Sequence, residues 1–433
     1  MASQTGGEEP AAQGVAVGAL PARVGRVSVS GVSRIRAGFL AAVMAPTLGA
    51  TTVQQAADAA RDACGRLAAL GMARQGRVEL RQGAGDTIDV HVACADGGRV
   101  AVRTGVDVGG DEGTASVAAR MNNVWGGGEY AEAHYARGTQ TAAAFRTVLG
   151  APVGGDPARR VELTAQQSTC DARAWGSHDD VRRSVGAAFR RSAGAVADEV
   201  AYAVAWREVA GVGARASPEL RRLAGHSVKA GVTAARTYDS RDSPTVPTAG
   251  TLARASLEAA GLGGSTRLAR ALVEVQASRR VGASCVVAAG LQAGAVWSPG
   301  AVPLADRFFV GGAHSVRGFA FRGIGPRDGA DALGGDVFYA AGLSVLSPPL
   351  PRLPALRAHL WANAGQCALL LAAPGPRADA ARFLRSPSAS VGVGLVYAHS
   401  LVRAELSWCL PLAATPTDQL RPGLQLGLGL QFL

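Results

Sequence analysis

Cysteine and histidine, the side chains that most often bind metals or act as nucleophiles, are few and scattered in this sequence. The six cysteines form no C-x-x-C pair, and the seven histidines show no metal-ligand spacing. The sequence contains no H-E-x-x-H, G-x-S-x-G or G-x-x-x-x-G-K-[ST] motif, and the glycine run at residues 126–128 is typical of a turn. We therefore predict that the chain is not an enzyme, with no catalytic residues and no metal or other cofactor.

Basic residues are the next candidates, because the net charge of +11 could attract nucleic acid. All but one of the 44 basic residues are arginine, the exception being Lys229, and they recur singly or in pairs along the whole chain. This even spread argues against a nucleic-acid partner. It predicts instead a structure whose interior is lined with charge.

Neither a membrane helix nor a targeting signal is expected. Residues 1–23 are interpreted as a polar N-terminal tail, because Glu8 and Glu9 stand where a presequence is poor in acidic residues. The longest uncharged stretch, residues 281–305, contains six glycines or prolines and alternates locally, which disfavours a spanning helix. If this chain crosses a membrane, it has to do so with strands.

Alternation of apolar and polar residues is the dominant pattern from residue 98 to the C-terminus. Near the end of the chain, for example, Leu424, Leu426 and Leu428 alternate with Gln425 and Gly427. A period of two residues is typical of a strand with one apolar face. Sixteen such segments begin near residues 99, 112, 128, 141, 159, 180, 198, 222, 248, 266, 282, 336, 355, 388, 401 and 423.

Sixteen segments over residues 98–433 leave roughly 21 residues for each strand and its connection, which suits tilted membrane-spanning strands of about 9 to 11 residues. Lipid cannot satisfy the open edge of a sheet, so a closed barrel is the economical architecture. We predict an all-β transmembrane barrel of sixteen antiparallel strands. A soluble β-sandwich or lipocalin-like barrel, whose strands also alternate, is the alternative.

Residues 24–95 follow a different pattern. A short strand ending at Gly31 precedes a candidate helix that reaches Ala45, and a second helix is expected from Thr51 or Thr52 as N-cap to Gly71 as C-cap. Two further strands complete the order β-α-α-β-β. This order predicts a small α+β domain ahead of the barrel.

Three motifs resemble the BamA superfamily of barrel-assembly proteins. The stretch Arg307–Phe319 is similar to the Gly-Gly and Arg-Gly-aromatic fingerprint of the family's inward-folded loop, Asp239–Gly250 to its turn motif, and Asn122–Glu132 to its early hairpin. The loop motif comprises Gly311, Gly312, Val316, Arg317, Gly318 and Phe319. The turn motif comprises Asp239, Arg241, Asp242, Pro247 and Gly250. The domain at residues 24–95 resembles a POTRA domain.

Within that superfamily, one POTRA-like domain and a sixteen-stranded barrel resemble the mitochondrial branch, the core barrel subunit of the sorting and assembly machinery. The resemblance implies an insertase of the mitochondrial outer membrane, with the POTRA-like domain in the intermembrane space. It implies β-barrel precursor proteins, accessory subunits on the cytosolic face and membrane lipid as partners. A passive porin and a protein-translocating channel of the plastid envelope or bacterial outer membrane are the alternatives.

The connection at residues 298–335 is too long for an ordinary loop on a compact barrel. Folding into the lumen would bury its phenylalanines and the Arg317 guanidinium, which would then need a partner. Asn363 and Glu405, on inward faces of nearby strands, are both candidates. The alternative is a surface loop whose arginine is solvated, and this would be the favoured interpretation if the family motif were disregarded.

The last strand provides a further functional prediction. A β-signal-like spacing is formed by Gln425, Gly427, Leu430 and Phe432, so the chain resembles a substrate of its own class. Closing the barrel pairs the first strand with the last, and we expect Val100 and Val102 to lie near Leu430 and Leu428. Because glycine weakens a strand, this seam should open most easily and admit a precursor by strand exchange.

Overall fold

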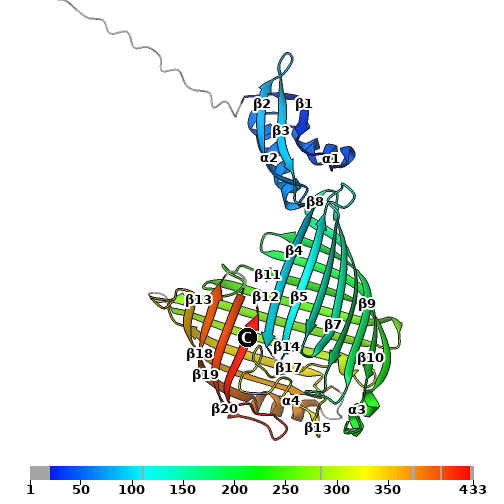
Figure 1. Ribbon diagram of the computed structural model, residues 1–433, viewed down its shortest axis with the longest axis vertical. Coiled ribbons are helices and arrows are strands. Elements are labelled where there is room, and N and C mark those ends of the chain that lie inside the picture. The colour runs from blue at the N-terminus through cyan, green and yellow to red at the C-terminus, as the bar shows by residue number, and fades with distance from the viewer. Residues whose placement is uncertain (1–19, 110–111, 283–284, 372–375, 400–401, 430–433) are drawn as a thin grey trace, which may run out of the picture. The chain divides into compact units, whose positions relative to one another are not determined.

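The fold is seen in a computed structural model that describes residues 20–109, 112–282, 285–371, 376–399 and 402–429 (Figure 1). The chain forms two compact units. One contains the N-terminal residues together with residues 121–131 and 151–157, and the other contains the rest of the barrel. No helix among the described residues is long and apolar enough to cross a membrane.

The N-terminal module, Arg23–Asp96, has the predicted β-α-α-β-β order. Its elements are β1 Arg23–Ser30, α1 Ala37–Leu48, α2 Val53–Ala69, β2 Ala73–Gln82 and β3 Thr87–Asp96. The central strand β3 runs parallel to β1 and antiparallel to β2. Thr52 caps α2 by accepting a hydrogen bond from the Gln55 N–H at 3.2 Å. Helix α1 continues two residues beyond Pro46, which lies inside the helix.

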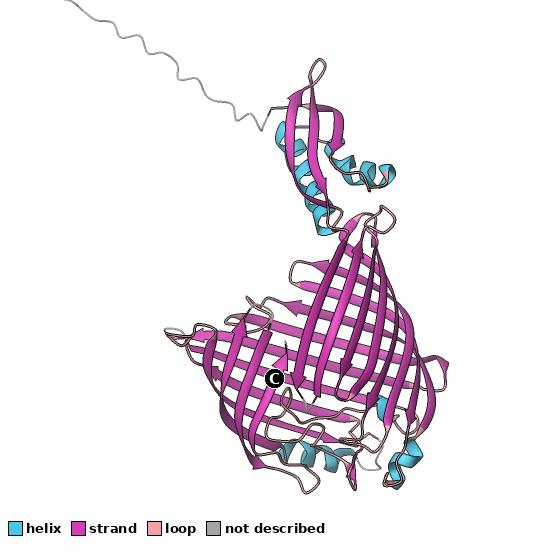
Figure 2. Cartoon of the chain, viewed as in Figure 1, coloured by secondary structure: helices cyan, strands magenta, loops and turns pink. Residues whose placement is uncertain are grey.

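Within the described residues, sixteen strands close into one barrel (Figures 1 and 2). These strands are β4 Val100–Gly109, β5 Glu112–Asn122, β6 Tyr130–Gly138, β7 Thr141–Val153, β8 Asp156–Asp171, β9 Asp179–Ala193, β10 Val196–Ala210, β11 Gly225–Asp239, β12 Gly250–Gly264, β13 Leu268–Val281, β14 Cys285–Trp297, β17 Val337–Leu346, β18 Leu356–Ala368, β19 Ser388–His399, β20 Val402–Ala413 and β21 Gly423–Gly429. Every start lies within three residues of its predicted position. The sixteen-stranded barrel is confirmed, and the β-sandwich alternative is wrong.

Two helices in the barrel connections were absent from the sequence prediction. Helix α3, Pro218–Leu223, precedes β11, and helix α4, Pro376–Arg385, lies between β18 and β19. The strand predicted near residue 222 begins three residues later, at Gly225, because α3 occupies residues 218–223. Ser217 caps α3 by accepting a hydrogen bond from the Leu220 N–H at 3.2 Å, and a proline occupies the first helical position.

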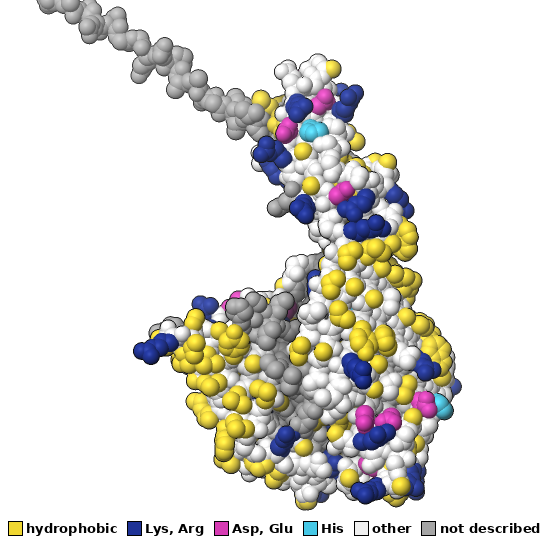
Figure 3. Space-filling view, viewed as in Figure 1, with side chains coloured by type: hydrophobic (Ala, Val, Ile, Leu, Met, Phe, Trp, Pro, Cys, Tyr) yellow, Lys and Arg dark blue, Asp and Glu magenta, His cyan; other side chains and the backbone are white. Residues whose placement is uncertain are grey.

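The barrel wall has one apolar and one polar face. On β20, Leu406, Trp408 and Leu410 are 44, 58 and 55% exposed, whereas the alternating residues Glu405 and Ser407 are buried. Figure 3 shows hydrophobic side chains spread over the outside of the wall. An apolar outer face and a polar lumen form the pattern that a strand requires when one face contacts lipid.

Candidate functional site: the inner loop and the seam

The connection between β14 and β17, residues 298–336, folds back into the barrel and is called the inner loop below. It contains one short 3-10 helix at Leu304–Asp306 and the two-residue strands β15 Arg327–Asp328 and β16 Asp331–Ala332. Its apolar side chains form a buried cluster with residues of β13, β14, β17 and β18. This cluster consists of Leu268, Val296, Val302, Phe308, Val310, Val316, Phe319, Ile324, Phe338, Ala340 and Cys367.

Glycines give the loop motif its conformation. Gly311 and Gly318 have φ angles of +112° and +82°, a region that side chains with a Cβ rarely adopt. A Cβ on Gly311 would lie 2.7 Å from the Ala320 carbonyl oxygen. Gly312 closes the turn by donating its N–H to the Val316 carbonyl at 3.2 Å. The backbone therefore turns tightly before and after Arg317.

Arg317 is 1% exposed and bonds to both residues that the sequence offered as partners. Its Nη1 donates to Asn363 Oδ1 at 2.9 Å, and its Nη2 donates to Glu405 Oε2 at 2.7 Å. The guanidinium also lies 5.1 Å from the ring centre of Trp361. Asn363 and Trp361 belong to β18 and Glu405 to β20, so one side chain ties the inner loop to two strands near the seam.

The Glu405 carboxylate continues this network through Arg403, its neighbour on the same face of β20. Arg403 Nη1 donates to the Thr245 carbonyl at 3.0 Å. Thr245 lies in the connection between β11 and β12, residues 240–249, which contains the predicted turn motif. Val246 of this connection packs against a buried cluster that includes Val286 and Leu346. The connection thus reaches into the lumen.

The turn motif is held together by hydrogen bonds between its own residues. The Asp239 carboxylate accepts hydrogen bonds from the Arg241 side chain at 2.8 and 2.9 Å, and Asp242 accepts the Thr248 N–H at 2.8 Å. Gly250 has a φ of +105°, and a Cβ there would lie 2.3 Å from the Ser240 carbonyl oxygen. Only glycine fits that position without movement of the backbone.

Pro247 lines a small cavity between this turn and the barrel wall. Arg241 and Arg403 line the same cavity. Arg241 also donates to the Gln276 side chain on β13 at 3.2 Å. The motif residues therefore fold the turn and dock it against neighbouring strands.

The last strand contacts the loop motif directly. Gln425 Oε1 accepts the Gly318 N–H at 3.1 Å, and Gln425 Nε2 donates to the Phe319 carbonyl at 3.2 Å. Phe319 is fully buried, and its backbone forms an isolated antiparallel β-bridge with Leu420, just before β21. Gly427, two residues after Gln425, lies opposite Glu405 in the β20–β21 register. The other two β-signal-like positions, Leu430 and Phe432, lie outside the described residues.

The predicted register of the seam is wrong. Strand β21 pairs with β4 through Leu428 and Val108, so Val100 and Val102 are eight and six residues away from the partner of Leu428. The prediction aligned the ends of the two strands. In a closed barrel the strands tilt and their registers are staggered, so the ends of the first and last strands do not coincide.

Comparison with known proteins identifies the family. Residues 101–432 match the model of the Omp85 superfamily domain. The chain belongs to the Omp85 superfamily. It is 30% identical to the SAM50-like protein of Schizosaccharomyces pombe over 96% of this chain and 91% of that protein. It is 29% identical to the human sorting and assembly machinery component 50 homolog over 75% of this chain and 71% of that protein.

Solved structures agree on the fold of this Omp85 chain. The crystal structure of BamA from Haemophilus ducreyi lacking POTRA domains 1–3 superimposes with a TM-score of 0.79, covering 94% of this chain and 84% of that chain at 15% identity. The resemblance to the BamA superfamily and its mitochondrial branch, drawn from the sequence motifs, is confirmed.

One ion cluster of the Omp85 barrel was missed by sequence reasoning. Asp306 of the inner loop is 1% exposed and accepts hydrogen bonds from Arg207 on β10 and from Lys229 Nζ on β11, the latter at 2.8 Å. Lys229 also pairs with Glu258 on β12 at 2.6 Å. Burial acts to raise the pKa of Asp306, but the Lys229 and Arg207 charges outweigh it and lower that pKa below its ordinary value.

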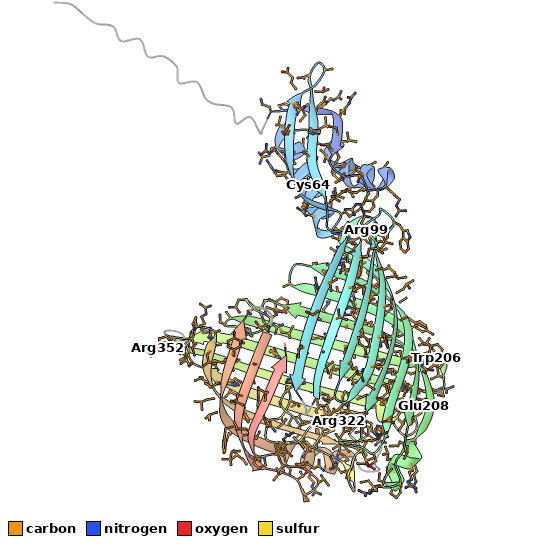
Figure 4. The ribbon with its side chains drawn as sticks, in the orientation of Figure 1. Cys64, Arg99, Trp206, Glu208, Arg322 and Arg352 are labelled. Carbon is orange, nitrogen blue, oxygen red and sulfur yellow. The ribbon has the colours of Figure 1, made fainter. Side chains whose placement is uncertain are left out.

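A second arginine of the inner loop was also missed. Arg322, labelled in Figure 4, has a φ of +56°, which is unusual for a residue other than glycine. Its guanidinium lies 4.4 Å from the ring centre of Phe309 and 4.6 Å from that of Trp175. Neither the Asp306 cluster nor the contacts of Arg322 could be predicted from residue spacing, because the interacting residues are more than ten positions apart in the sequence.

The early hairpin lies in the same compact unit as the N-terminal module. Glu129 accepts the Gly127 N–H at 2.7 Å and forms an ion pair with Arg36. The Arg36 N–H donates to the Gly126 carbonyl at 2.9 Å, and the Asn123 side chain donates to the Arg34 carbonyl at 2.7 Å. The hairpin therefore holds the segment that leads into α1.

Proposed function

We propose that this chain is an insertase that folds β-barrel precursors into the mitochondrial outer membrane. The observation that carries the proposal is the inner loop, which Arg317 fixes to β18 and β20 and which Gln425 joins to the last strand. The relatives that match most of the chain are named as sorting and assembly machinery components. The apolar outer wall supports a position in lipid.

The proposed mechanism is strand exchange at the seam between β4 and β21. Among the described residues, this seam has Leu428 paired with Val108, whereas β20 and β21 pair over seven positions. Backbone groups of an unpaired edge find no water inside a bilayer, so a precursor strand that pairs with β4 would satisfy them. Hydrogen bonds made on capture then favour insertion, and no nucleotide or cofactor is needed.

The N-terminal module fits a role in receiving precursors. It is a POTRA-like domain in this proposal, and its place is the intermembrane space. Its three-stranded sheet, with β1 and β2 at the two edges, could take up an extended segment by strand addition. Accessory subunits would then sit on the cytosolic face of the barrel, and membrane lipid would cover the outer wall.

Depletion of the chain from cells provides the test. Imported porin should remain unassembled and protease-sensitive in the depleted mitochondria, while an outer-membrane protein anchored by a helix should insert normally as the control. Fractionation of a tagged chain separates the alternatives, because a plastid envelope or bacterial outer-membrane location would favour a protein-translocating channel. Normal porin assembly after depletion would contradict the proposal.

A further inference from the structure

Helix α4 lies against the outside of the barrel wall. Tyr339 on β17 points outward, because it alternates with Phe338 of the buried lumenal cluster, and Gln366 on β18 is its register partner on the same face. The ring of Phe383, in α4, packs edge-on against the Tyr339 ring with centres 5.1 Å apart. The Gln366 side chain donates to the Ser386 carbonyl, just beyond the helix, at 2.8 Å. The end of α4 therefore covers two outward-facing side chains.

This helix lies near the end of the wall where the inner loop begins, the same end as α3 (Figure 1). Trp297, the last residue of β14, is 54% exposed, and Tyr339 is the third residue of β17. Leu371, in the connection that leads to α4, lines a hollow in the outer wall together with Trp297. Outward-facing aromatic residues near strand ends mark the level of the membrane–water interface. The helix thus lies at the level where an interface is expected.

The last turn of α4 separates apolar from basic side chains. Phe383 faces the wall, whereas Leu384 is 67% exposed. Arg382 and Arg385 are also exposed, and neither forms an ion pair with another residue that the structure describes. At 3.6 residues per turn, Arg382 projects about 160° away from Leu384, and Arg385 about 160° away from Phe383. The wall, the exposed leucine and the two arginines therefore occupy three different sides of the helix.

A phospholipid interface is the environment that suits all three sides. Water would leave Leu384 solvated beside an apolar wall, and the hydrocarbon core would take the guanidinium groups out of water at high cost. At the level of the headgroups, the leucine reaches acyl chains while the arginines bind phosphate. The sequence of α4 contains three arginines and one aspartate, so its net charge is complementary to an anionic headgroup.

We propose that α4 is an interfacial helix that binds anionic phospholipid headgroups beside β17 and β18. Leu384 enters the acyl region, and Arg382 and Arg385 hold the phosphates. In the proposed orientation of the barrel this is the cytosolic leaflet. The inference rests on the proposed position of the barrel in lipid and is independent of the insertase activity.

The first experiment measures the depth of the helix in a bilayer. The full chain, with its six cysteines replaced by serine or alanine, is reconstituted into phosphatidylcholine vesicles with or without phosphatidylglycerol. A polarity-sensitive fluorophore is attached to one cysteine at Leu384, Arg385 or Leu360, and quenching by brominated acyl chains is recorded. Leu360 is the positive control, because it is 58% exposed on the outer face of β18. The fluorophore at 384 should be quenched as strongly as that at 360, and the fluorophore at 385 should not.

The second experiment tests the headgroup charge with the fluorophore at 384. Quenching should be stronger in the vesicles that contain phosphatidylglycerol. Replacing Arg382 and Arg385 by glutamine should make insertion of the helix about 25-fold less favourable there, about fivefold for each arginine, and should abolish the difference between the two vesicle types. Arg352→Gln is the matched control, because Arg352 is an exposed arginine in the turn between β17 and β18 (Figure 4).

The outcomes separate this inference from the proposed function. A fluorophore that is in water at 384 but in lipid at 360 overturns the inference and leaves the membrane position intact, whereas water at both positions contradicts the membrane position itself. Equal quenching in the two vesicle types refutes binding of anionic headgroups. Protection of a cysteine at 384 in mitochondria, without quenching in vesicles, would identify a protein partner instead of lipid and overturn the inference.

A further measurement needs no substitution. Wild-type chain is placed in vesicles that contain phosphatidylglycerol with a photoactivatable acyl chain, and the labelled peptides are identified by mass spectrometry. Labelling of the peptide that contains Leu384 supports the inference even if the cysteine-free chain fails to fold. Labelling of the β18 peptide that contains Leu360 without labelling of α4 overturns it.

Discussion

Substitution of Arg317 by alanine removes the side chain that links the inner loop to β18 and β20. The guanidinium is 1% exposed and donates to Asn363 and Glu405. Without the guanidinium, the side-chain oxygen of Asn363 loses the hydrogen bond from Arg317. Glu405 also loses Arg317 but keeps its ion pair with Arg403. The loop should then leave its docked position more often.

The magnitude follows from these contacts. Breaking a buried ion pair costs about 3 to 5 kcal/mol, and we take the lower value, about 3 kcal/mol, because Arg403 still compensates part of the Glu405 charge. At about 1.4 kcal/mol per factor of ten, the equilibrium between docked and undocked loop shifts about 100-fold. Arg317→Lys keeps the charge without the planar fork, so its effect should be intermediate.

Two readouts test this reasoning. The variant should still be inserted in the membrane, chymotrypsin should cleave the phenylalanines of the inner loop faster, and imported porin should assemble more slowly. Arg182→Ala is the matched control. Arg182 lies on the same face of β9 as the buried Ser184, but its own side chain is exposed, so this variant removes an arginine that is not buried. Wild-type cleavage and wild-type porin assembly in Arg317→Ala would refute the argument.

Three further predictions follow from other contacts. Asp306→Asn should loosen the inner loop where it contacts β10 and β11, and so raise protease cleavage of the loop. Because the pKa of Asp306 is lowered, its charge stabilises the fold at neutral pH, and this stabilisation is lost as the pH falls through the lowered value. The cleavage rates of wild type and variant should therefore converge in acid. Cysteines at Val108 and Leu428 should form a disulfide that stops porin assembly until it is reduced, and no block despite complete oxidation would argue against an opening seam. Gly250→Ala should lower the melting temperature of the purified protein far more than Gly194→Ala, because both positions have positive φ but only Gly250 lacks room for a Cβ; equal melting temperatures would show that the clash is relieved.

The strands could be predicted because alternation is a local property. Each of the sixteen segments carries its own period of two, and turn residues bound it, so their starts were placed within three residues. The same alternation put Asn363 and Glu405 on inward faces, where Arg317 meets both. Local patterning was sufficient for these features.

Features that depend on the closure of the barrel could not be predicted. The register of Val108 with Leu428 follows from tilt and stagger accumulated over all strands, and no single strand encodes it. The Asp306 cluster joins a loop to β10, β11 and β12, which are about 50 to 100 residues away in the sequence. Lys229, the one lysine of the sequence, marked a position of interest on an inward face, but the sequence did not indicate that it binds Asp306.

The inner loop is anchored by ion pairs at two places on the wall, through Asp306 to β10 and β11 and through Arg317 to β20. It is therefore a chord across the circumference of the barrel. If precursor strands enter at the seam as proposed, each added strand lengthens the circumference by about 4.8 Å. Because the chord keeps the distance between β10 and β20 constant, the extra length must be taken up on the arc from β4 to β9. New strands should consequently emerge as a sheet that is already curved for closure into a barrel of their own.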